Sequence, residues 1–192
     1  MTPKQLHIYT EEIYIHTQLA LSNYQTFRNI VDNPGTRQHR EAWMYLQSFL
    51  SHFGMVSKLL FAPSGNRRAK DRANKLSVHL ITDDTSALNN RDARNALEHL
   101  DERMDNWLDA GHKGILEGIF EEEKDFAYLS PDRWIVRRVF ILAESLFITE
   151  EQDGPKKMEI QPLIEELSRL NGLCYEKFNN ENPYYIVQPN LI

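Results

Sequence analysis

The chain has 192 residues, 41% of them hydrophobic and 26% charged, with a net charge of −6. This balance predicts one globular domain and excludes a disordered or membrane-embedded chain, because no apolar run is long enough to span a bilayer. The single cysteine excludes an intrachain disulfide, and the acidic charge excludes a protein that coats nucleic acid by charge alone.

The first part of the chain predicts three amphipathic helices. The N-terminus lacks the basic and then apolar pattern of a signal peptide, so we expect a cytoplasmic protein. Apolar residues recur three and four positions apart over residues 5–31, 36–61 and 68–80, which is the spacing of one buried helix face. The third helix also has a basic outer face, which is either a solvated surface or a guide for RNA: Arg67, Arg68, Lys70, Arg72 and Lys75.

The second part of the chain begins with a fourth helix and then changes character. This helix is predicted from about Leu88 to Ala110, and Gly111 ends it. Residues 134–149 are β-branched and aromatic, with Glu144-Ser145 between two apolar runs, which favours a β-hairpin over a short helix. A turn at residues 153–155 and a candidate third strand at residues 158–160 follow, and a final helix is expected over residues 162–178.

These elements together predict a mainly α fold in a single domain over residues 1–192. We expect a bundle of four to five helices in residues 1–112, followed by a small C-terminal β-hairpin and a closing helix in residues 113–192. The seven histidines show no close metal-ligand spacing, so we expect neither a metal nor a cofactor.

The predicted fourth helix concentrates side chains that suit phosphate chemistry. Arg94, Asn95 and His99 bring together a permanent planar cation, an amide and an imidazole that titrates near neutrality. Asn95 and His99 are four residues apart and share a helix face, whereas Arg94 lies about 140° around the helix from His99. A distorted helix, a long arginine side chain that wraps around it, or a second copy of the helix across a twofold axis would complete the site.

Other residues of the same helix leave a structural role open. A solvated surface with ion pairs explains the charged residues equally well, since exposed pairs of this kind are common. If the helix binds a phosphate, its carboxylates must be paired, and we assign Arg91, Glu102 and Arg103 to substrate binding beside the three central residues. The helix also has an apolar stripe: Ala93, Leu97, Leu100, Met104, Trp107 and Leu108.

The pattern of Arg94, Asn95 and His99 resembles the signature of the HEPN superfamily, the higher eukaryotes and prokaryotes nucleotide-binding domains. Members are all-helical, and a late helix carries Arg followed within a few residues by His. The similarity extends to uncharacterised bacterial HEPN-like proteins and, in architecture, covers roughly residues 5–110.

The resemblance implies a homodimer, paired through the motif helix, that cleaves RNA without a metal. Arg94 would bind the phosphate, Asn95 would position the phosphate or the helix pairing, and His99 would transfer protons while the ribose 2′-hydroxyl attacks. It also implies a role as a toxin or in defence, with RNA or a nucleotide and a cognate antitoxin as partners. Other members are non-catalytic, so the alternative is a nucleotide-binding, protein-interaction or dimerisation module.

Overall fold

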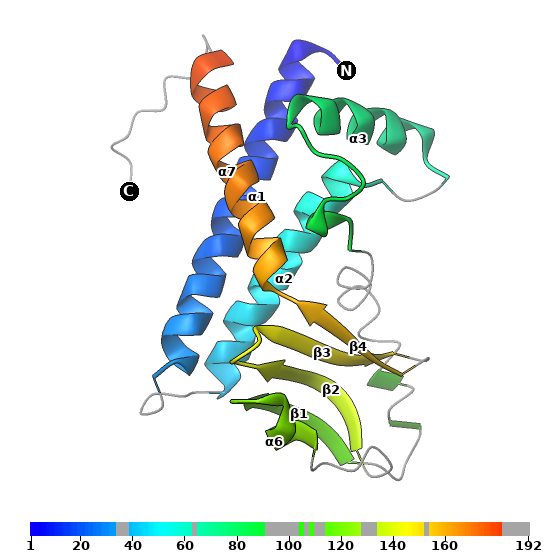
Figure 1. Cartoon of the computed structure of the whole chain (residues 1–192). Helices are drawn as coiled ribbons and strands as arrows, with labels where there is room; N and C mark the ends of the chain where they lie inside the picture. The colour runs from blue at the N-terminus through cyan, green and yellow to red at the C-terminus, as the bar shows by residue number, and fades with distance from the viewer. Residues whose placement is uncertain are drawn as a thin grey trace.

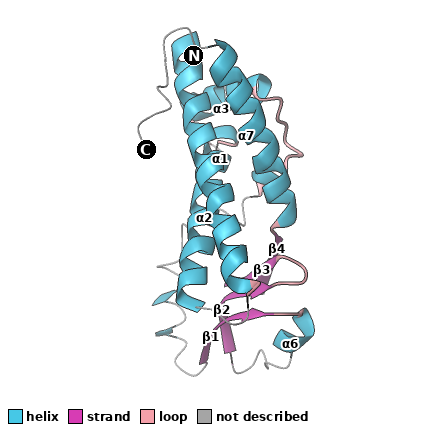
Figure 2. Cartoon of the chain, turned by 90° about the vertical axis from the view of Figure 1, so that its left-hand side faces the viewer, coloured by secondary structure: helices cyan, strands magenta, loops and turns pink. Residues whose placement is uncertain are grey.

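The computed structural model describes residues 1–33, 39–62, 65–90, 104–105, 108–109, 114–127, 134–151 and 154–181. Three long helices, α1 (Pro3–Val31), α2 (His39–Leu60) and α7 (Gln161–Glu181), form a bundle, and the shorter α3 (Arg67–His79) lies across one end of it (Figure 1). A small sheet lies at the other end of the bundle (Figure 2). The remaining elements are η2 (Ala87–Asn89), β1 (Gly114–Phe120), α6 (Glu123–Ala127), β2 (Trp134–Ile141), β3 (Leu146–Glu151) and β4 (Gly154–Glu159).

The structure confirms the three predicted N-terminal helices, and local capping explains where two of them begin. Thr2 and Gln5 form a reciprocal capping box at the start of α1, in which each side chain accepts a hydrogen bond from the other residue's backbone N–H. Asn66 caps α3 by accepting a hydrogen bond of 3.0 Å from the backbone N–H of Ala69. Leu19 departs from the predicted buried face of α1, since it is 42% exposed.

The main hydrophobic core joins the helices to one face of the sheet. Phe27 of α1 is fully buried, and its ring meets the edge of Phe140 of β2 at a centroid distance of 4.8 Å. Other aromatic residues of the first two helices are buried as well. Those that are fully or nearly fully buried are Trp43, Phe49 and Phe53.

The closing helix α7 contributes to this same core. Leu163, Leu167, Leu170 and Cys174 belong to the cluster that also contains the buried residues of α1 and α2. Polar contacts add to the α1–α7 seam, because Asn171 donates to Thr17 at 2.8 Å and accepts from Gln18 at 2.7 Å. The core therefore draws on residues from both sides of position 112.

The predicted β-hairpin is only part of the sheet, which has four strands within the described residues, in the order β1-β2-β3-β4. Strands β2, β3 and β4 form an antiparallel meander, whereas β1 pairs with β2 in parallel. The fold is therefore mainly helical rather than all-helical. Gly154 and Pro155 were predicted as part of a turn, but they lie in β4. Glu151 at the end of β3 pairs with Gly154 at the start of β4, so β4 already begins at Gly154.

Strand β1 was not predicted because its sequence carries weak strand signals. Gly118 and Glu117 interrupt its apolar residues, and glycine within a strand usually lowers the strand propensity. The Phe120 ring lies close to Gly118 and leaves little room for a side chain there, since a Cβ at Gly118 would lie 2.6 Å from that ring. The pairing register also shifts between Leu116 and Glu117.

The predicted start of the fourth helix at Leu88 is wrong. Leu88 lies in the short 3-10 helix η2, and Asn90 has extended backbone angles, with φ −71° and ψ 102°. An extended residue cannot continue a helix, so no α-helix runs through this position. Among the described helices, none combines the length and apolar character needed to cross a membrane.

Candidate functional site

The six predicted site residues fall in a stretch whose structure is not described. Evidence about this site therefore comes from its two flanks: residues 80–90, which lead into the motif, and residues 104–105 and 108–109, which follow it. The predicted residues that lie outside the described part of the chain are Arg91, Arg94, Asn95, His99, Glu102 and Arg103.

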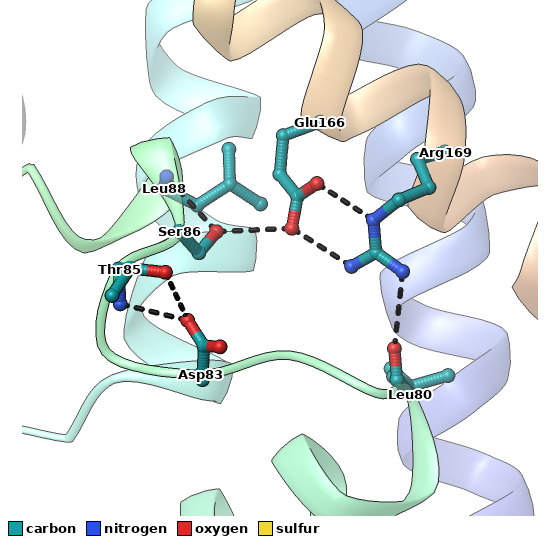
Figure 3. Close-up of polar contacts among 7 residues, drawn as sticks. All are labelled: Leu80, Asp83, Thr85, Ser86, Leu88, Glu166 and Arg169. Carbon is teal, nitrogen blue, oxygen red and sulfur yellow. Dashed lines mark hydrogen bonds and ion pairs between the residues drawn. The ribbon is translucent and has the colours of Figure 1, made fainter.

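A polar cluster ties the leading flank to α7 (Figure 3). Ser86 donates a hydrogen bond of 3.0 Å to Glu166, and Arg169 binds both carboxylate oxygens of Glu166 at 2.7 and 2.8 Å. Arg169 also donates to the carbonyl of Leu80 at 3.5 Å. We call Ser86, Glu166 and Arg169 the anchor cluster, because it connects this flank to α7 at two points, Leu80 and Ser86.

The electrostatics of the anchor cluster favour its charged form. The hydrogen bond from Arg169 lowers the pKa of Glu166, and the hydrogen bond from Ser86 adds to this effect, whereas burial opposes it. A bidentate contact between a guanidinium and a carboxylate also restricts the geometry of both groups. The anchor cluster therefore remains ionised and oriented near neutral pH.

Further contacts fix the backbone on both sides of Ser86. Asp83 accepts hydrogen bonds from the backbone N–H and the hydroxyl of Thr85, and these bonds lower the pKa of Asp83. Ser86 accepts from the backbone N–H of Leu88 at 3.3 Å, and the Leu88 side chain is fully buried in the core. The chain thus reaches Asn90 from a fixed position on the scaffold.

The following flank exposes apolar side chains. Met104 and Leu108 lie in helical segments and belong to the predicted apolar stripe, yet they are 38% and 65% exposed. Four residues apart, they would share one face of the helix that the sequence predicts here. Within a single chain, these two residues of the predicted apolar stripe are therefore exposed to solvent.

A basic pocket lies between α1 and α3. It has a volume of about 420 Å³, and three cationic residues of α3, Arg68, Arg72 and Lys75, contribute to its wall. The sequence showed the basic face of α3 but did not predict that α1 would complete a pocket beside it. We call this the basic pocket, and its lining residues are Met1, Gln5, Tyr9, Asn66, Arg68, Ala69, Asp71, Arg72 and Lys75.

A pair of histidines joins α1 to α2. The Nδ1 atoms of His16 and His52 are 2.8 Å apart, so one ring donates a proton that the other accepts. Glu12 lies 3.9 Å from the Nε2 atom of His16. Burial lowers the pKa of His52, and the neighbouring His16 lowers it further. No local sequence signal predicted this pair, because its members come from different helices.

The sequence matches no family model, and comparisons with curated proteins and with solved structures give no significant match. The case for a function therefore depends on the residues of this chain and on the arrangement of its described part.

Proposed function

We propose that the protein is a HEPN-like, metal-independent endoribonuclease that acts as a homodimer. The observation that carries this proposal is the pattern of Arg94, Asn95 and His99, which supplies an anion-binding cation, a positioning amide and a proton carrier within a short stretch. Arg91, Glu102 and Arg103 flank these residues and are assigned to substrate binding.

The reaction needs only groups that this chain and its substrate provide. The ribose 2′-oxygen attacks the adjacent phosphorus and loses its proton, while the bond to the 5′-oxygen breaks and that oxygen gains a proton. His99 moves these protons, and Arg94 stabilises the negative charge that grows on the phosphate. The products are a 2′,3′-cyclic phosphate and a 5′-hydroxyl end.

Two features of the described flanks support the dimer. The anchor cluster gives the motif a fixed starting point on the bundle. Met104 and Leu108 then present an apolar surface that a second copy would cover. Because Arg94 and His99 point in directions about 140° apart on a straight helix, pairing two helices is an economical way to bring them to one phosphate.

The test is cleavage of single-stranded RNA in excess chelator, with the products identified by mass spectrometry. The proposal predicts that Arg94→Ala and His99→Ala each lower the rate by at least about a hundredfold. An RNA with a 2′-deoxy nucleotide at the cleavage position should remain intact. Arg40→Ala is the matched control, because Arg40 is exposed on α2 and should leave the rate unchanged.

One result of this assay would contradict the catalytic role of His99. Equal cleavage by the wild type and by His99→Ala protein would remove His99 from the mechanism. If no RNA is cleaved while the protein still dimerises, the exposed Met104 and Leu108 favour the second candidate, a non-catalytic dimerisation or nucleotide-binding module.

A further inference from the structure

The basic pocket has a charge opposite to that of the whole chain. Three cationic side chains, Arg68, Arg72 and Lys75, line it, and among its lining side chains Asp71 is the one carboxylate. The chain as a whole has a net charge of −6. A concentration of positive charge in an acidic protein attracts anions locally, because nearby charges dominate the potential within a concave surface.

One of these cations, Arg68, lies in the first turn of α3, where its charge opposes the helix dipole. The first turn of α3 contains no acidic residue, and Arg67 and Arg68 are its first two residues. A helix N-terminus carries partial positive charge, so cations there are unfavourable and an anion is favourable. Local conflicts of this kind are expected where a residue serves binding rather than stability.

Arg72 is held in place before any ligand arrives. Its guanidinium lies 5.6 Å from the centre of the Tyr9 ring, and its Nη2 atom donates to the carbonyl of Lys58 at 3.0 Å. Its Nε atom is buried and has no hydrogen-bond partner within the described residues. A cation fixed in this way loses little conformational entropy on binding an anion.

The opposite wall adds neutral donors. Gln5 lines the pocket, and its carbonyl oxygen is already used by the backbone N–H of Thr2 at 2.8 Å. Its amide N–H groups therefore remain the part of the side chain suited to a ligand. Together with the cations, these donors match the oxygen-rich surface of a phosphate.

We propose that the basic pocket binds the phosphate of a nucleotide or of an RNA strand, at a site built from residues other than Arg94 and His99. Its volume of about 420 Å³ suits a small polar ligand such as a nucleoside monophosphate. The site does not depend on the nuclease proposal, because none of its lining residues belongs to the motif.

The test compares two double variants of α3 that change the charge equally. Arg68→Ala with Lys75→Ala removes two exposed cations of the basic pocket, whereas Arg67→Ala with Lys70→Ala removes two exposed cations outside it. Binding of fluorescent single-stranded RNA is measured by anisotropy as a function of salt, in His99→Ala protein so that the RNA stays intact. The pocket variant should weaken binding by about tenfold and reduce the salt slope by about 2. The control should change the affinity by less than about twofold.

Two probes distinguish the sources of the phosphate. Adenosine monophosphate and inorganic phosphate are each titrated into labelled protein, and the Gln5 side-chain amide signal is followed by NMR. A shift with adenosine monophosphate indicates a free nucleotide site, and RNA binding without that shift indicates a site for the strand. Equal losses of affinity in both double variants, or no loss in either, would overturn the proposal. Cleavage activity is not part of this readout, so failure here is distinct from failure of the nuclease proposal.

Discussion

The helical bundle and the segment that leads into the motif are held by different kinds of contact. Helices α1, α2 and α7 share an apolar core in which Phe27, Phe49 and Leu167 are fully buried. The segment over residues 80–90 is fixed by the anchor cluster and by capping contacts, and by its two fully buried apolar residues, Leu80 and Leu88. Beyond the motif, Met104 and Leu108 are exposed.

This difference indicates where stability and function reside. Apolar burial contributes most of the free energy of folding and needs no fixed hydrogen-bond geometry. A polar cluster contributes less net free energy but specifies position, since its bonds require defined distances and angles. The bundle therefore acts as the stable scaffold, and the anchor cluster fixes the segment that leads into the motif. In the proposed homodimer, a second copy would cover Met104 and Leu108.

The largest expected effect comes from charging the exposed apolar flank. If the proposed homodimer forms, Met104→Glu with Leu108→Glu should convert it to monomers and lower the proposed RNA cleavage by at least about a hundredfold, because carboxylates oppose burial in an interface. Mass measurement by light scattering checks the first result, and a cleavage assay checks the second. Met44→Glu is the control, since Met44 is 71% exposed on α2 and should change neither.

The next effect tests the scaffold. Phe27→Ala should lower the free energy of unfolding by about 3–5 kcal/mol, because it leaves a cavity beside Phe140. Urea denaturation measures the change. Ile8→Ala in the same helix is the control and should cost less than about 1 kcal/mol, since Ile8 is 46% exposed. Similar values for the two variants would contradict the assignment of Phe27 to the central core.

A smaller effect is expected from the anchor cluster. Glu166→Ala should lower the free energy of unfolding by about 1–3 kcal/mol, because it leaves Ser86 and Arg169 without their shared acceptor. Hydrogen exchange should accelerate at the backbone amides of Leu88 and Asn90, both of which are hydrogen-bonded. Glu165→Ala, at an exposed neighbouring position, should leave these amides protected. Unchanged exchange in Glu166→Ala protein would show that the cluster does not fix this segment.

The smallest effect concerns the histidine pair. The pKa of His52 is lowered from its ordinary value of 6.5, so below that pH the unfolded chain binds this proton more readily than the folded protein. The stabilisation from neutral His52 is present above pH 6.5 and is lost as the pH falls toward the lowered pKa.

His52→Asn provides the comparison, because its amide retains a hydrogen-bonding group near the Nδ1 position without titrating. Between pH 7.5 and pH 5.5, the Tm of the wild type should fall by roughly 1–3 °C more than that of the variant. Glu12 and His16 face this site in both proteins, so their contributions remain in the comparison. Parallel pH profiles would contradict the effect.

The sequence predicted those parts of the fold that depend on local periodicity. The helix expected over residues 5–31 is observed as Pro3–Val31, and the closing helix expected over residues 162–178 is observed as Gln161–Glu181. Strand β1 was missed because its partner is a parallel strand that lies farther along the chain, and Gly118 weakens its pattern.

The anchor cluster could not be predicted for a related reason. Ser86 and Glu166 are 80 residues apart, and neither belongs to a recognisable motif. The His16–His52 contact likewise depends on how two helices align. Arg94, Asn95 and His99 were identified by residue type and spacing alone, so their roles stay a prediction.

The central claim is that Arg94 from one copy and His99 from the other act on the same phosphate. It is tested most directly by mixing Arg94→Ala protein with His99→Ala protein and measuring RNA cleavage in excess chelator. Each variant alone should be inactive. In an equal mixture, however, half of all dimers would be heterodimers, and each heterodimer would have one intact site. Because each heterodimer would keep one of its two sites, the mixture should recover about a quarter of the wild-type activity. A mixture that forms heterodimers and remains as inactive as either variant would contradict it.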